Sequence, residues 1–568
     1  MEQEKSLVDV LVVGAGPVGL ITAYQLARFG GVSVRIIEKH TKSVQDAYGR
    51  AITLFPRSSE MLDQLGLADE LLQEAFACRE TVAYNSEGEE VHGRGWSFMG
   101  DMKDTAFDFA LVLRQKYQEE IFRKALQKYG VEVEASSELI DLDVGSSFPE
   151  SGYPITAAVR HAESSNVHFI RCKRLVGADG GRSSVRRLLA IPFEGSTSED
   201  KWVRIDGKVK TNLPKPRTYC SIESPTHGNV LWVGLDRDAT RIGYAFTDDR
   251  ANAYTEFDEK AAIQEAIAAV KPFSLEFERV DWWTIYTVGQ RIAQRFSLDE
   301  RVFLVGDACH THSSGAAQGL NTGIHDAVNL GWKLSLVVRG LAPASLLNTY
   351  EMERRPHVEK LIQYDADISR LMTNRLPQNW QGDPTADVNE VLGRIMDEAG
   401  SFSSGLGISY DAQVNNPLIH MSNVSGPLVA GMRAPDISLL RPGTFEHTRL
   451  IRETPNVGCF YVVFFPVGNA LRSNVSLQRI SLLQNYITDR CVRYLTVFPT
   501  KAPSVYGSLG RTYFDLESRA GYQRYCVDPD QGSVVVLRPD GWIYAMIPSV
   551  TDVAGELEAI FKGLFLDI

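Results

Sequence analysis

A glycine-rich segment near the start of the chain has residue types and spacing that can hold phosphate groups. Gly14, Gly16 and Gly19 form a G-x-G-x-x-G pattern between a short apolar run, residues 8–13, and a helical pattern over residues 20–29. In this context the first glycine permits a tight turn, the second lets a pyrophosphate approach the backbone, and the third lets helix and strand pack closely. The pattern therefore predicts a dinucleotide-binding turn inside a β–α–β unit.

Glu38 and Pro17 belong to the same motif. A second strand pattern, residues 32–38, ends at Glu38, where a carboxylate can accept hydrogen bonds from ribose hydroxyls and disfavours the additional phosphate of NADP. Pro17 lies inside the turn and is counted with the glycines among the expected cofactor contacts. The helix N-terminus, with its free N–H groups, then faces the phosphates. A glycine-rich turn that binds nothing is the alternative, and the strand–turn–helix context argues against it.

Two later segments also end a strand with a turn that leads into a helix. The first, Val-Gly-Ala-Asp-Gly-Gly-Arg at residues 176–182, places Asp179 in an Asp-Gly turn. The second, Val-Phe-Leu-Val-Gly-Asp-Ala-Cys-His at residues 302–310, places Asp307 in a Gly-Asp turn. The G-x-G-x-x-G motif alone is compatible with NAD. The identity of the cofactor is therefore inferred from these two segments together with the first motif.

The three motifs together resemble the flavoprotein aromatic hydroxylases of the p-hydroxybenzoate hydroxylase fold. Two further runs, Tyr-Thr-Val-Gly-Gln-Arg at 286–291 and Leu-Gly-Trp-Lys-Leu at 330–334, are similar to the phenol 2-monooxygenase branch of that family. The similarity extends over most of the chain and includes a C-terminal extension typical of that branch. The resemblance implies that FAD is the tightly held cofactor.

The resemblance also assigns roles to residues. Asp307 is expected to accept hydrogen bonds from ribityl hydroxyls or to lie beside the pyrophosphate, with a helix N-cap as the alternative. A helix that begins within residues 316–323 is expected to point at the pyrimidine end of the flavin, where its dipole stabilises the negative charge of the reduced flavin. A surface salt bridge is the alternative for Arg50, and a helix cap is the alternative for Gln115. The positions that match flavin contacts of the family are Arg50, Gln115, Asp179, Gln318, Gly319, Leu320 and Asn321.

The chemistry implied by the resemblance is aromatic hydroxylation. NAD(P)H reduces FAD, O2 adds to the reduced flavin, and a flavin hydroperoxide transfers hydroxyl to an electron-rich phenolic or polyketide-type ring. Tyr286 matches a tyrosine that contacts the phenol oxygen in phenol hydroxylases and is the candidate catalytic residue. Arg182, Arg186 and Arg187 are candidates for the phosphates of the transient reductant, with a solvated helix face as the alternative. The choice between NADH and NADPH stays open.

The sequence departs from the phenol hydroxylase pattern in two places. The family reads G-x-A-D-G-L where this chain has Gly-Arg-Ala-Ile-Thr-Leu at 49–54, so Ile52 replaces an Asp that helps to deprotonate phenol. The family also has Ser-Pro before its Gly-Gln-Gly segment, whereas residues 313–318 contain no proline. Both changes favour a bulkier aromatic or polyketide substrate, as in secondary metabolism, over simple phenol.

The expected architecture is α/β, with a Rossmann-like FAD-binding domain, an inserted substrate-binding β-sheet domain and a C-terminal thioredoxin-like domain. Helices are expected over 57–78, 114–128, 316–338 and 476–487. The C-terminal part lacks a redox C-x-x-C pair, so a structural role or the support of a homodimer is expected there. The expected limits are 1–200 and 284–370 for the two parts of the FAD-binding domain, 201–283 for the sheet domain, 371–430 for a connector and 431–568 for the thioredoxin-like domain.

Composition excludes several other classes of protein. The 568 residues carry a net charge of −12, which argues against a nucleic-acid partner. The seven scattered cysteines fit a reducing cytoplasm, and the apolar run near the N-terminus is interrupted by glycine and proline, so no membrane partner is expected. His310, His312 and His325 lack further ligands at zinc-like spacing, so no metal is expected.

Several other functions remain compatible with the motifs. A same-fold flavoenzyme could catalyse epoxidation, oxidative rearrangement or oxidation without ring hydroxylation, and a non-catalytic flavin-binding regulator belongs to a different class. A flavin halogenase is disfavoured, because its W-x-W-x-I-P segment is absent.

Overall fold

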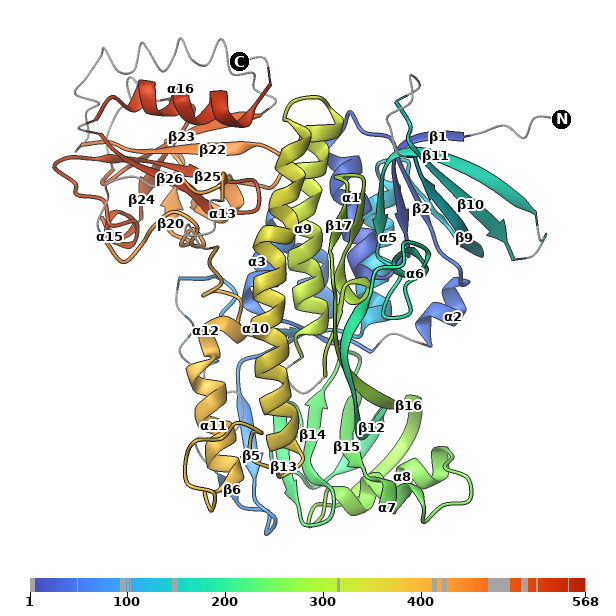
Figure 1. Cartoon of the computed structure of the whole chain (residues 1–568). Helices are drawn as coiled ribbons and strands as arrows, with labels where there is room; N and C mark the ends of the chain where they lie inside the picture. Colours follow the sequence, from blue (N-terminus) through green and yellow to red (C-terminus); the bar gives the residue numbers. More distant parts are fainter. Residues whose placement is uncertain are drawn as a thin grey trace.

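The computed structural model describes residues 6–566 with the exception of short gaps. Those gaps are residues 48–49, 92–98, 100–101, 103, 146–151, 163, 165, 314–316, 411–415, 421–425, 468–490, 502–508, 517–518 and 550. The expected helix at 476–487 and part of the 313–318 segment therefore lie outside the described residues. The chain has a mixed α/β fold built around three large sheets (Figure 1).

The first sheet contains the strand that leads into the G-x-G-x-x-G motif. Its central strand β1 pairs in parallel with β2 and β11, and β11 pairs in parallel with β18. Helices cover this sheet, which explains why its core strands are nearly continuous apolar runs. Its strands are β17 (Ser297–Leu298), β18 (Val302–Leu304), β11 (Val167–Gly177), β1 (Ser6–Val13), β2 (Val34–Ile37) and β8 (Val133–Glu134), with β10 (Ile155–His161) and β9 (Ser137–Val144) attached to β11.

The second sheet lies below the first in Figure 1 and is largely antiparallel. It is not confined to residues 201–283, because β5 and β6 from the early part of the chain join one edge and its longest strands begin before 201 and end after 283. In order across the sheet, its strands are β19 (His310–Thr311), β16 (Leu275–Ala293), β12 (Phe193–Thr211), β15 (Thr240–Phe246), β14 (Gly228–Gly234), β13 (Tyr219–Ser224), β5 (Thr81–Tyr84) and β6 (Glu90–Val91).

The third large sheet belongs to the C-terminal part of the chain and packs around its own hydrophobic core. In order, it contains β21 (His447–Arg449), β20 (Ser438–Leu440), β24 (Arg511–Asp515), β23 (Val492–Phe498), β22 (Phe460–Phe465), β25 (Ser533–Leu537) and β26 (Ile543–Pro548). A small sheet is formed by β3 (Thr53–Leu54), β7 (Ala110–Val112) and β4 (Phe76–Cys78), in that order.

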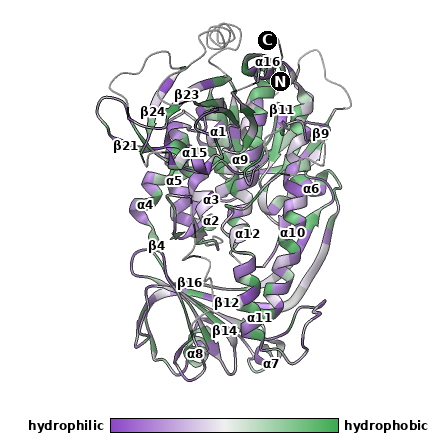
Figure 2. Ribbon diagram, turned by 90° about the vertical axis from the view of Figure 1, so that its left-hand side faces the viewer, coloured by the Kyte–Doolittle hydropathy of each residue, from purple (hydrophilic) through white to green (hydrophobic). Residues whose placement is uncertain are grey.

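The helices fill the space between and around the sheets. Two long ones, α9 and α10, run side by side along the molecule, and α10 and α11 flank the second sheet in both views (Figures 1 and 2). Among the described helices, none combines the length and the apolar character that crossing a bilayer requires. The helices are α1 (Pro17–Phe29), α2 (Lys42–Asp46), α3 (Pro56–Gln64), α4 (Ala68–Glu74), α5 (Gln115–Gln127), α6 (Ser184–Leu188), α7 (Asp248–Ala251), α8 (Glu259–Ala269), η2 (Gly306–Ala308), α9 (Gly319–Val338), η3 (Ala344–Leu347), α10 (Asn348–Met372), α11 (Val388–Glu398), α12 (Gly400–Ser403), α13 (Leu450–Glu453), α15 (Ala520–Arg524) and α16 (Val553–Leu564).

Three expected elements differ from the structure. The helix expected over 57–78 is divided into α3 and α4, because Gly66 adopts a φ of 72° that a right-handed helix does not allow. The helix expected from 316 begins at Gly319. The segment 371–430, expected to be loop-rich, contains the helices α11 and α12.

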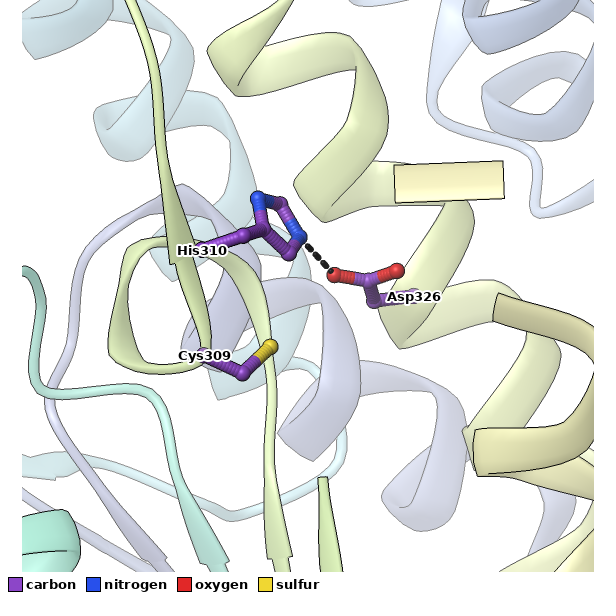
Figure 3. A group of neighbouring side chains, drawn as sticks. All are labelled: Cys309, His310 and Asp326. Atoms are coloured by element: carbon purple, nitrogen blue, oxygen red, sulfur yellow. Dashed lines mark hydrogen bonds and ion pairs between the residues drawn. The ribbon is translucent and has the colours of Figure 1, made fainter. Parts of the chain in front are cut away.

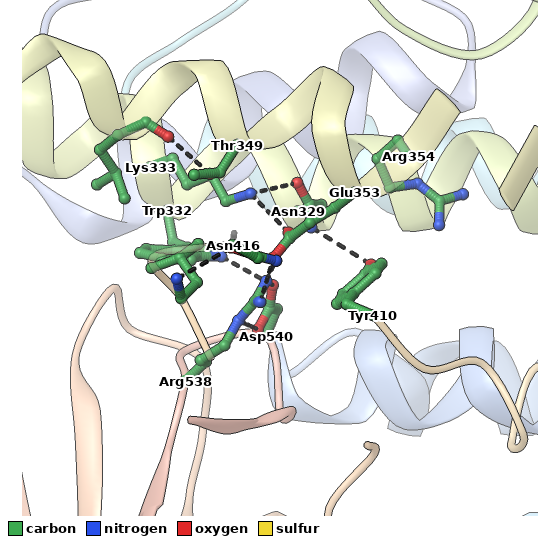
Figure 4. Close-up of polar contacts among 12 residues, drawn as sticks. Asn329, Trp332, Lys333, Thr349, Glu353, Arg354, Tyr410, Asn416, Arg538 and Asp540 are labelled. Carbon is green, nitrogen blue, oxygen red and sulfur yellow. Dashed lines mark hydrogen bonds and ion pairs between the residues drawn. The ribbon is translucent and has the colours of Figure 1, made fainter. Parts of the chain in front are cut away.

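The hairpin between β25 and β26 anchors the C-terminal sheet to the helices α9 and α10. The Arg538 guanidinium donates to both oxygens of Glu353, at 2.5 and 2.9 Å, and to Asp540 at 2.6 and 3.0 Å (Figure 4). Lys333 donates to Glu353 at 2.8 Å, and the Trp332 indole donates to Asp540 at 3.0 Å. Burial by itself raises the pKa of Glu353, but Arg538 and Lys333 outweigh it and hold that pKa well below its usual range.

A second buried pair of cations holds the same hairpin from the side of α3. Arg57 donates to the backbone oxygen of Asp540 at 2.6 Å, and its guanidinium lies 4.3 Å from the ring of Trp542. Glu60 accepts hydrogen bonds from Arg57 and from Arg433 at 2.8 Å each. The turn of the hairpin is therefore enclosed by charged groups from α3 and from the C-terminal part of the chain.

Replacing Arg538 by Met should destabilise the whole protein rather than the C-terminal sheet alone. The substitution leaves Asp540 and one face of Glu353 buried without their principal cation, at a cost of about 3–5 kcal/mol. Urea denaturation followed by fluorescence should show the loss. The control K562M removes a cation from the exposed Lys562–Glu558 pair and should leave the midpoint nearly unchanged. Equal midpoints for the two variants would contradict the anchoring role.

Candidate active site

The glycine-rich turn is formed by close backbone packing. Gly14 has a φ of 103°, and a Cβ there would lie 2.4 Å from the backbone oxygen of Ala178. A Cβ on Gly19 would lie 2.0 Å from the backbone oxygen of Gly14. Around Gly16, in contrast, no heavy atom comes within 4 Å of an added Cβ. Two glycines are thus required by the fold, while the third faces open space at the N-terminus of α1.

We call the three strand-to-helix turns corners: the first is the glycine-rich turn at residues 14–19, the second is at residues 176–182 and the third at residues 302–310. The second corner follows β11 and touches the first. The Ala178 N–H donates to the backbone oxygen of Val13 at 2.8 Å. One oxygen of Asp179 accepts hydrogen bonds from the N–H groups of Ser184 at 2.6 Å and Val185 at 3.1 Å. The other oxygen is buried and has no hydrogen-bond partner among the described residues, and burial raises the pKa of Asp179. Asp179 therefore organises the start of α6 and keeps one acceptor available.

The third corner packs on the other side of α1. A Cβ on Gly306 would lie 3.1 Å from Val18, and one on Gly323 would lie 2.6 Å from the same side chain. Asp307 is exposed in the short turn η2, whose N-cap is Val305 and which has no side-chain cap. The helix-cap alternative for Asp307 is therefore not seen. The three corners expected from the sequence meet around the first turn of α1.

Glu38 lies at the end of β2 beside the glycine-rich turn. Its side chain is buried, and its two oxygens accept hydrogen bonds from the N–H groups of Ala15 and His40 at 2.9 Å each. The carboxylate is thus fixed next to the turn, at the position expected for a ribose contact. Pro17 is the first residue of α1, where its missing N–H costs no helical hydrogen bond.

Gln115 connects α5 to the loop that carries Arg50. Its amide oxygen accepts hydrogen bonds from the N–H groups of Arg50 and Ala51 at 3.2 Å each, and its amide nitrogen donates to Glu119 at 2.8 Å. The guanidinium of the exposed Arg50 lies 5.8 Å from the ring of Tyr286. Arg50 and Tyr286, far apart in the sequence, therefore lie close to each other.

The start of α9 is fixed by side-chain hydrogen bonds. Asn321 accepts a hydrogen bond from the Phe55 N–H at 2.8 Å and donates to the backbone oxygen of Thr53 at 3.0 Å. Gln318 donates to the backbone oxygen of Ser403 at 2.9 Å. These two side chains are engaged within the protein, whereas Gly319 adds no side chain to the end of the helix. The side chain of Leu320 is buried in the core around β1.

Tyr286 lies on β16, directly opposite Trp202 of β12. Its ring is half-buried, and the Arg204 guanidinium lies 3.4 Å from its hydroxyl oxygen. Ile52 is buried in an apolar cluster with Phe55 and Tyr219, so no carboxylate takes the place of the family's Asp at this position.

Tyr219 and Arg204 were not singled out by the motifs, although both lie near the candidate site. The Tyr219 hydroxyl lies 3.0 Å from the Thr53 hydroxyl, and burial raises its pKa to about 12, so it stays protonated at neutral pH. The sequence signal for Arg204 is a cation between the apolar residues Val203 and Ile205 of a strand pattern.

Arg186 does not lie on a solvated helix face and is not free to receive phosphates. It is buried, donates to the backbone oxygens of Ala308 at 2.7 Å and Gly181 at 2.8 Å, and packs 3.8 Å from the ring of Phe193. It joins the second corner to the third, because its fork reaches a carbonyl of each.

Cys309, His310 and Asp326 have ligand-type atoms within 4.8 Å of one another, all buried (Figure 3). His310 is hydrogen-bonded to Asp326 at 2.7 Å, and Asp326 also accepts hydrogen bonds from the Gly306 N–H at 3.0 Å and from Arg354 at 2.8 Å. Burial by itself raises the pKa of Asp326, but His310 and Arg354 outweigh it and lower that pKa. Asp326 is paired with the Arg354 cation and accepts hydrogen bonds from Gly306 and His310. We therefore interpret Cys309, His310 and Asp326 as a structural group that holds the third corner in place.

Glu119 should make stability depend on pH. Burial raises its pKa to about 7, whereas the unfolded side chain titrates near 4.5. Between these values the folded chain binds the additional proton, so stability falls as the pH rises through this window, by about 3 kcal/mol in total. E119Q should therefore be more stable than the wild type at pH 8 in urea denaturation, and similar to it at pH 4.

The exposed neighbour on the same helix provides the control for this prediction. E120Q removes a carboxylate from the solvent side of α5 and should keep the wild-type pH dependence. The same slope in E119Q and the wild type would show that Glu119 is not the group responsible.

Comparison with known proteins agrees with this geometry. The family model described as FAD binding domain matches residues 7–365. A phenol 2-monooxygenase of Aspergillus fumigatus (fsqG) is 29% identical over 99% of this chain and 97% of its own length. A 12-dehydrotetracycline 5-monooxygenase/anhydrotetracycline 6-monooxygenase of Streptomyces rimosus is 31% identical over 61% of this chain and 66% of its own length.

Solved structures share the fold over nearly the whole chain. The anhydrotetracycline hydroxylase OxyS of Streptomyces rimosus superposes with a TM-score of 0.72 at 24% identity and covers 98% of this chain and 99% of its own. Aklavinone-11 hydroxylase, solved with FAD and aklavinone, gives a TM-score of 0.72 at 22% identity, with 99% of each chain covered. The family match spans all three corners that meet at α1, which confirms the resemblance drawn from the motifs: the chain belongs to the FAD binding domain family of flavoprotein aromatic hydroxylases.

Proposed function

We propose that this protein is an FAD-dependent monooxygenase that uses NAD(P)H and O2 to hydroxylate an aromatic small molecule. The observation that carries the proposal is the meeting of three strand-to-helix corners around the first turn of α1. Tyr286 of the second sheet lies close to Arg50, 5.8 Å from ring to guanidinium.

The residues at the corners fit FAD. Gly16 leaves space for a pyrophosphate, Glu38 beside the turn would accept hydrogen bonds from a ribose, and the buried unpaired oxygen of Asp179 and the exposed carboxylate of Asp307 would offer acceptors for hydroxyl groups. Gly14, Pro17 and Gly19 shape the turn itself. When bound, FAD would supply electron transfer from NAD(P)H and the activation of O2.

The start of α9 and the Arg50 loop would hold the reactive end of the cofactor. Because the side chains of Gln318 and Asn321 are engaged within the protein, the N–H groups of Gly319 and Leu320 are the contacts that α9 offers, together with its dipole. Gln115 fixes the Arg50 loop by accepting two of its backbone hydrogen bonds.

The substrate would lie against Tyr286. The named relatives act on phenols and on anhydrotetracycline, which supports a phenolic or polyketide-type ring as the substrate class. Tyr286 would orient the ring oxygen by a hydrogen bond, and the apolar surroundings of Ile52 and Trp202 would exclude water from the reacting atoms.

We further propose the domain organisation that the sequence predicts. Residues 1–200 and 284–370 form the FAD-binding domain, 201–283 supply the middle of the substrate-binding sheet, 371–430 connect, and 431–568 form a thioredoxin-like domain without the redox C-x-x-C. The parallel pairing of β22, β23 and β24 in the C-terminal sheet supports the last assignment. The scattered free cysteines support a reducing, cytoplasmic location.

Two glycine substitutions should separate folding from cofactor binding. G16A adds a methyl group to open space, so the protein should fold and melt like the wild type while its FAD affinity falls by about tenfold or more. G14A forces a Cβ against Ala178 and should lower stability itself. Melting without FAD and FAD uptake, read from flavin fluorescence, give the two quantities. Unchanged FAD affinity in G16A would contradict the assigned phosphate position.

Turnover tests the reaction. Phenol, 3-hydroxybenzoate and anhydrotetracycline are suitable trial substrates for the FAD-loaded protein, with NADPH loss followed at 340 nm and products by mass. An accepted substrate should stimulate NADPH oxidation and gain the mass of one oxygen, and Y286F should lower kcat/KM for it by about tenfold.

The matched control for Y286F is Y254F. The Tyr254 hydroxyl donates a hydrogen bond to Glu265 of α8, on the opposite side of the second sheet. Removing this hydroxyl should leave kcat/KM unchanged. Substrate-stimulated NADPH loss without a gain of oxygen mass would instead indicate an oxidase or a reductase.

A further inference from the structure

A cavity of about 670 Å³ lies between the second sheet and the helices α10 and α11. Strand β13 contributes alternate residues to its wall, because successive side chains of a strand point to opposite faces, and Ile222 packs on the other side, with α8. Tyr219 and Glu223 both line the cavity and lie four residues apart, so this wall is about 13 Å long. The cavity is therefore elongated and has room for several fused or linked rings.

The inner end of the cavity borders the candidate active site. The hydroxyl of Tyr219 lies 3.0 Å from that of Thr53. The backbone oxygen of Thr53 in turn accepts a hydrogen bond from Asn321, at the start of α9. Met372 also lines the cavity and packs in the same apolar cluster as Tyr286. A molecule whose reacting ring lies against Tyr286 thus has room to extend into the cavity.

Helix α11 forms the opposite wall with one stripe of side chains. Asn389, Leu392 and Met396 all line the cavity, and their spacing of three and four residues places them on one face of the helix. Leu392 and Met396 belong to the apolar cluster that also holds Ile52. Asn389 is the polar member of this stripe and is 8% exposed. The segment expected to be a connector therefore supplies both apolar surface and one amide to the cavity.

Hydrogen bonds hold the Asn389 amide in place. The Ser221 hydroxyl donates to Oδ1 of Asn229 at 3.4 Å, and Nδ2 of Asn229 donates to Oδ1 of Asn389 at 3.0 Å. The N–H groups of Asn389 and Glu390 donate to Asp387 at 2.8 and 2.9 Å, which fixes the start of α11. Within the described part of the chain, no group accepts a hydrogen bond from Nδ2 of Asn389. The amide therefore keeps N–H donors for a molecule in the cavity.

The charges around the cavity favour an uncharged ligand at this end. Among the described residues that line it, the charged side chain is Glu223, a half-buried carboxylate, and there is no lysine, arginine or histidine. An anionic group would lose its hydration here without a cation to offset that cost. An uncharged carbonyl or hydroxyl oxygen, in contrast, can accept a hydrogen bond from the amide without that penalty.

We infer that Asn389 is a specificity-determining residue that donates a hydrogen bond to an uncharged carbonyl or hydroxyl oxygen at the end of the substrate remote from the hydroxylated ring. The inference rests on the proposed function and narrows its substrate class to elongated aromatic molecules that carry such an oxygen. The intervening rings lie between Leu231 of the sheet and Met396 of α11. Because methionine side chains are flexible and polarisable, this wall adapts to rings of different outline.

Three para-substituted hydroxybiphenyls test the inference by binding alone. 4-Acetyl-4′-hydroxybiphenyl carries a remote carbonyl, and 4-hydroxymethyl-4′-hydroxybiphenyl carries a remote hydroxyl. 4-Ethyl-4′-hydroxybiphenyl has nearly the same shape but no remote acceptor. Calorimetric titration of the FAD-loaded protein gives the dissociation constants. The acetyl compound should bind about fivefold to tenfold more tightly than the ethyl compound, as expected for one hydrogen bond. Whichever of the acetyl and hydroxymethyl compounds binds more tightly identifies the preferred oxygen.

N389D removes the donor without changing the size of the side chain. The new carboxylate can still accept the hydrogen bond from Asn229, and an acid is favourable in the first turn of a helix, so the variant should fold. It should lose the preference for the acetyl over the ethyl compound, because no N–H faces the carbonyl. The matched control is N379D, which makes the same change in an exposed turn before α11 and should keep the wild-type preference.

A second variant tests whether the cavity itself is occupied. M396W fills space on the α11 wall and should weaken binding of all three biphenyls, while the one-ring ligand 4-ethylphenol binds as before. Absent or equal binding of the acetyl and ethyl compounds, an unchanged preference in N389D, or biphenyl binding unaltered by M396W overturns the inference. Because these titrations need no turnover, an Asn389-dependent preference without oxygen insertion refutes only the proposed monooxygenase reaction.

Discussion

The contact of α1 with two other backbones is the constraint on which the cofactor site depends. Gly14 and Gly19 allow the first turn of α1 to touch the corner at Ala178, and Val18 touches Gly306 and Gly323 on the other side. Any larger residue at Gly14 or Gly19 would overlap backbone atoms, which cannot move aside as a flexible side chain can. Arg186 and Asp326 reinforce the arrangement through hydrogen bonds to the same corners. Sites that must hold a long dinucleotide need this rigidity, because their donors and acceptors come from separate parts of the chain.

The sequence predicted those parts of the molecule whose signals are local. The G-x-G-x-x-G turn, the strands before each corner and the helix expected over 114–128 depend on neighbouring residues, and the structure confirms them, with α5 at Gln115–Gln127. The pairing of β5 with β13 could not be predicted in the same way, because it joins residues that are far apart in the chain and carries no turn signal. Burial of Arg186 was missed for a related reason: a helical pattern shows which face a residue occupies, but not which carbonyl groups another segment brings to it.

The hairpin at Arg538 shows how one local signal can have a long-range role. An Asp-Gly turn between two apolar runs predicts a hairpin, and β25 and β26 form it. Its turn, however, brings Asp540 and Arg538 into a buried set of charges with Glu353, which belongs to α10. Buried ion pairs add little to stability compared with apolar packing, but they strongly penalise any arrangement that separates the partners. The C-terminal sheet is therefore held in one orientation relative to the helices α9 and α10.

The same reasoning about charge applies to the substrate side of the site. A carboxylate at position 52 would accept a proton, and it would also place a negative charge beside any anion formed on the substrate. With Ile52 in an apolar cluster and Tyr219 held protonated, this chain has neutral groups there.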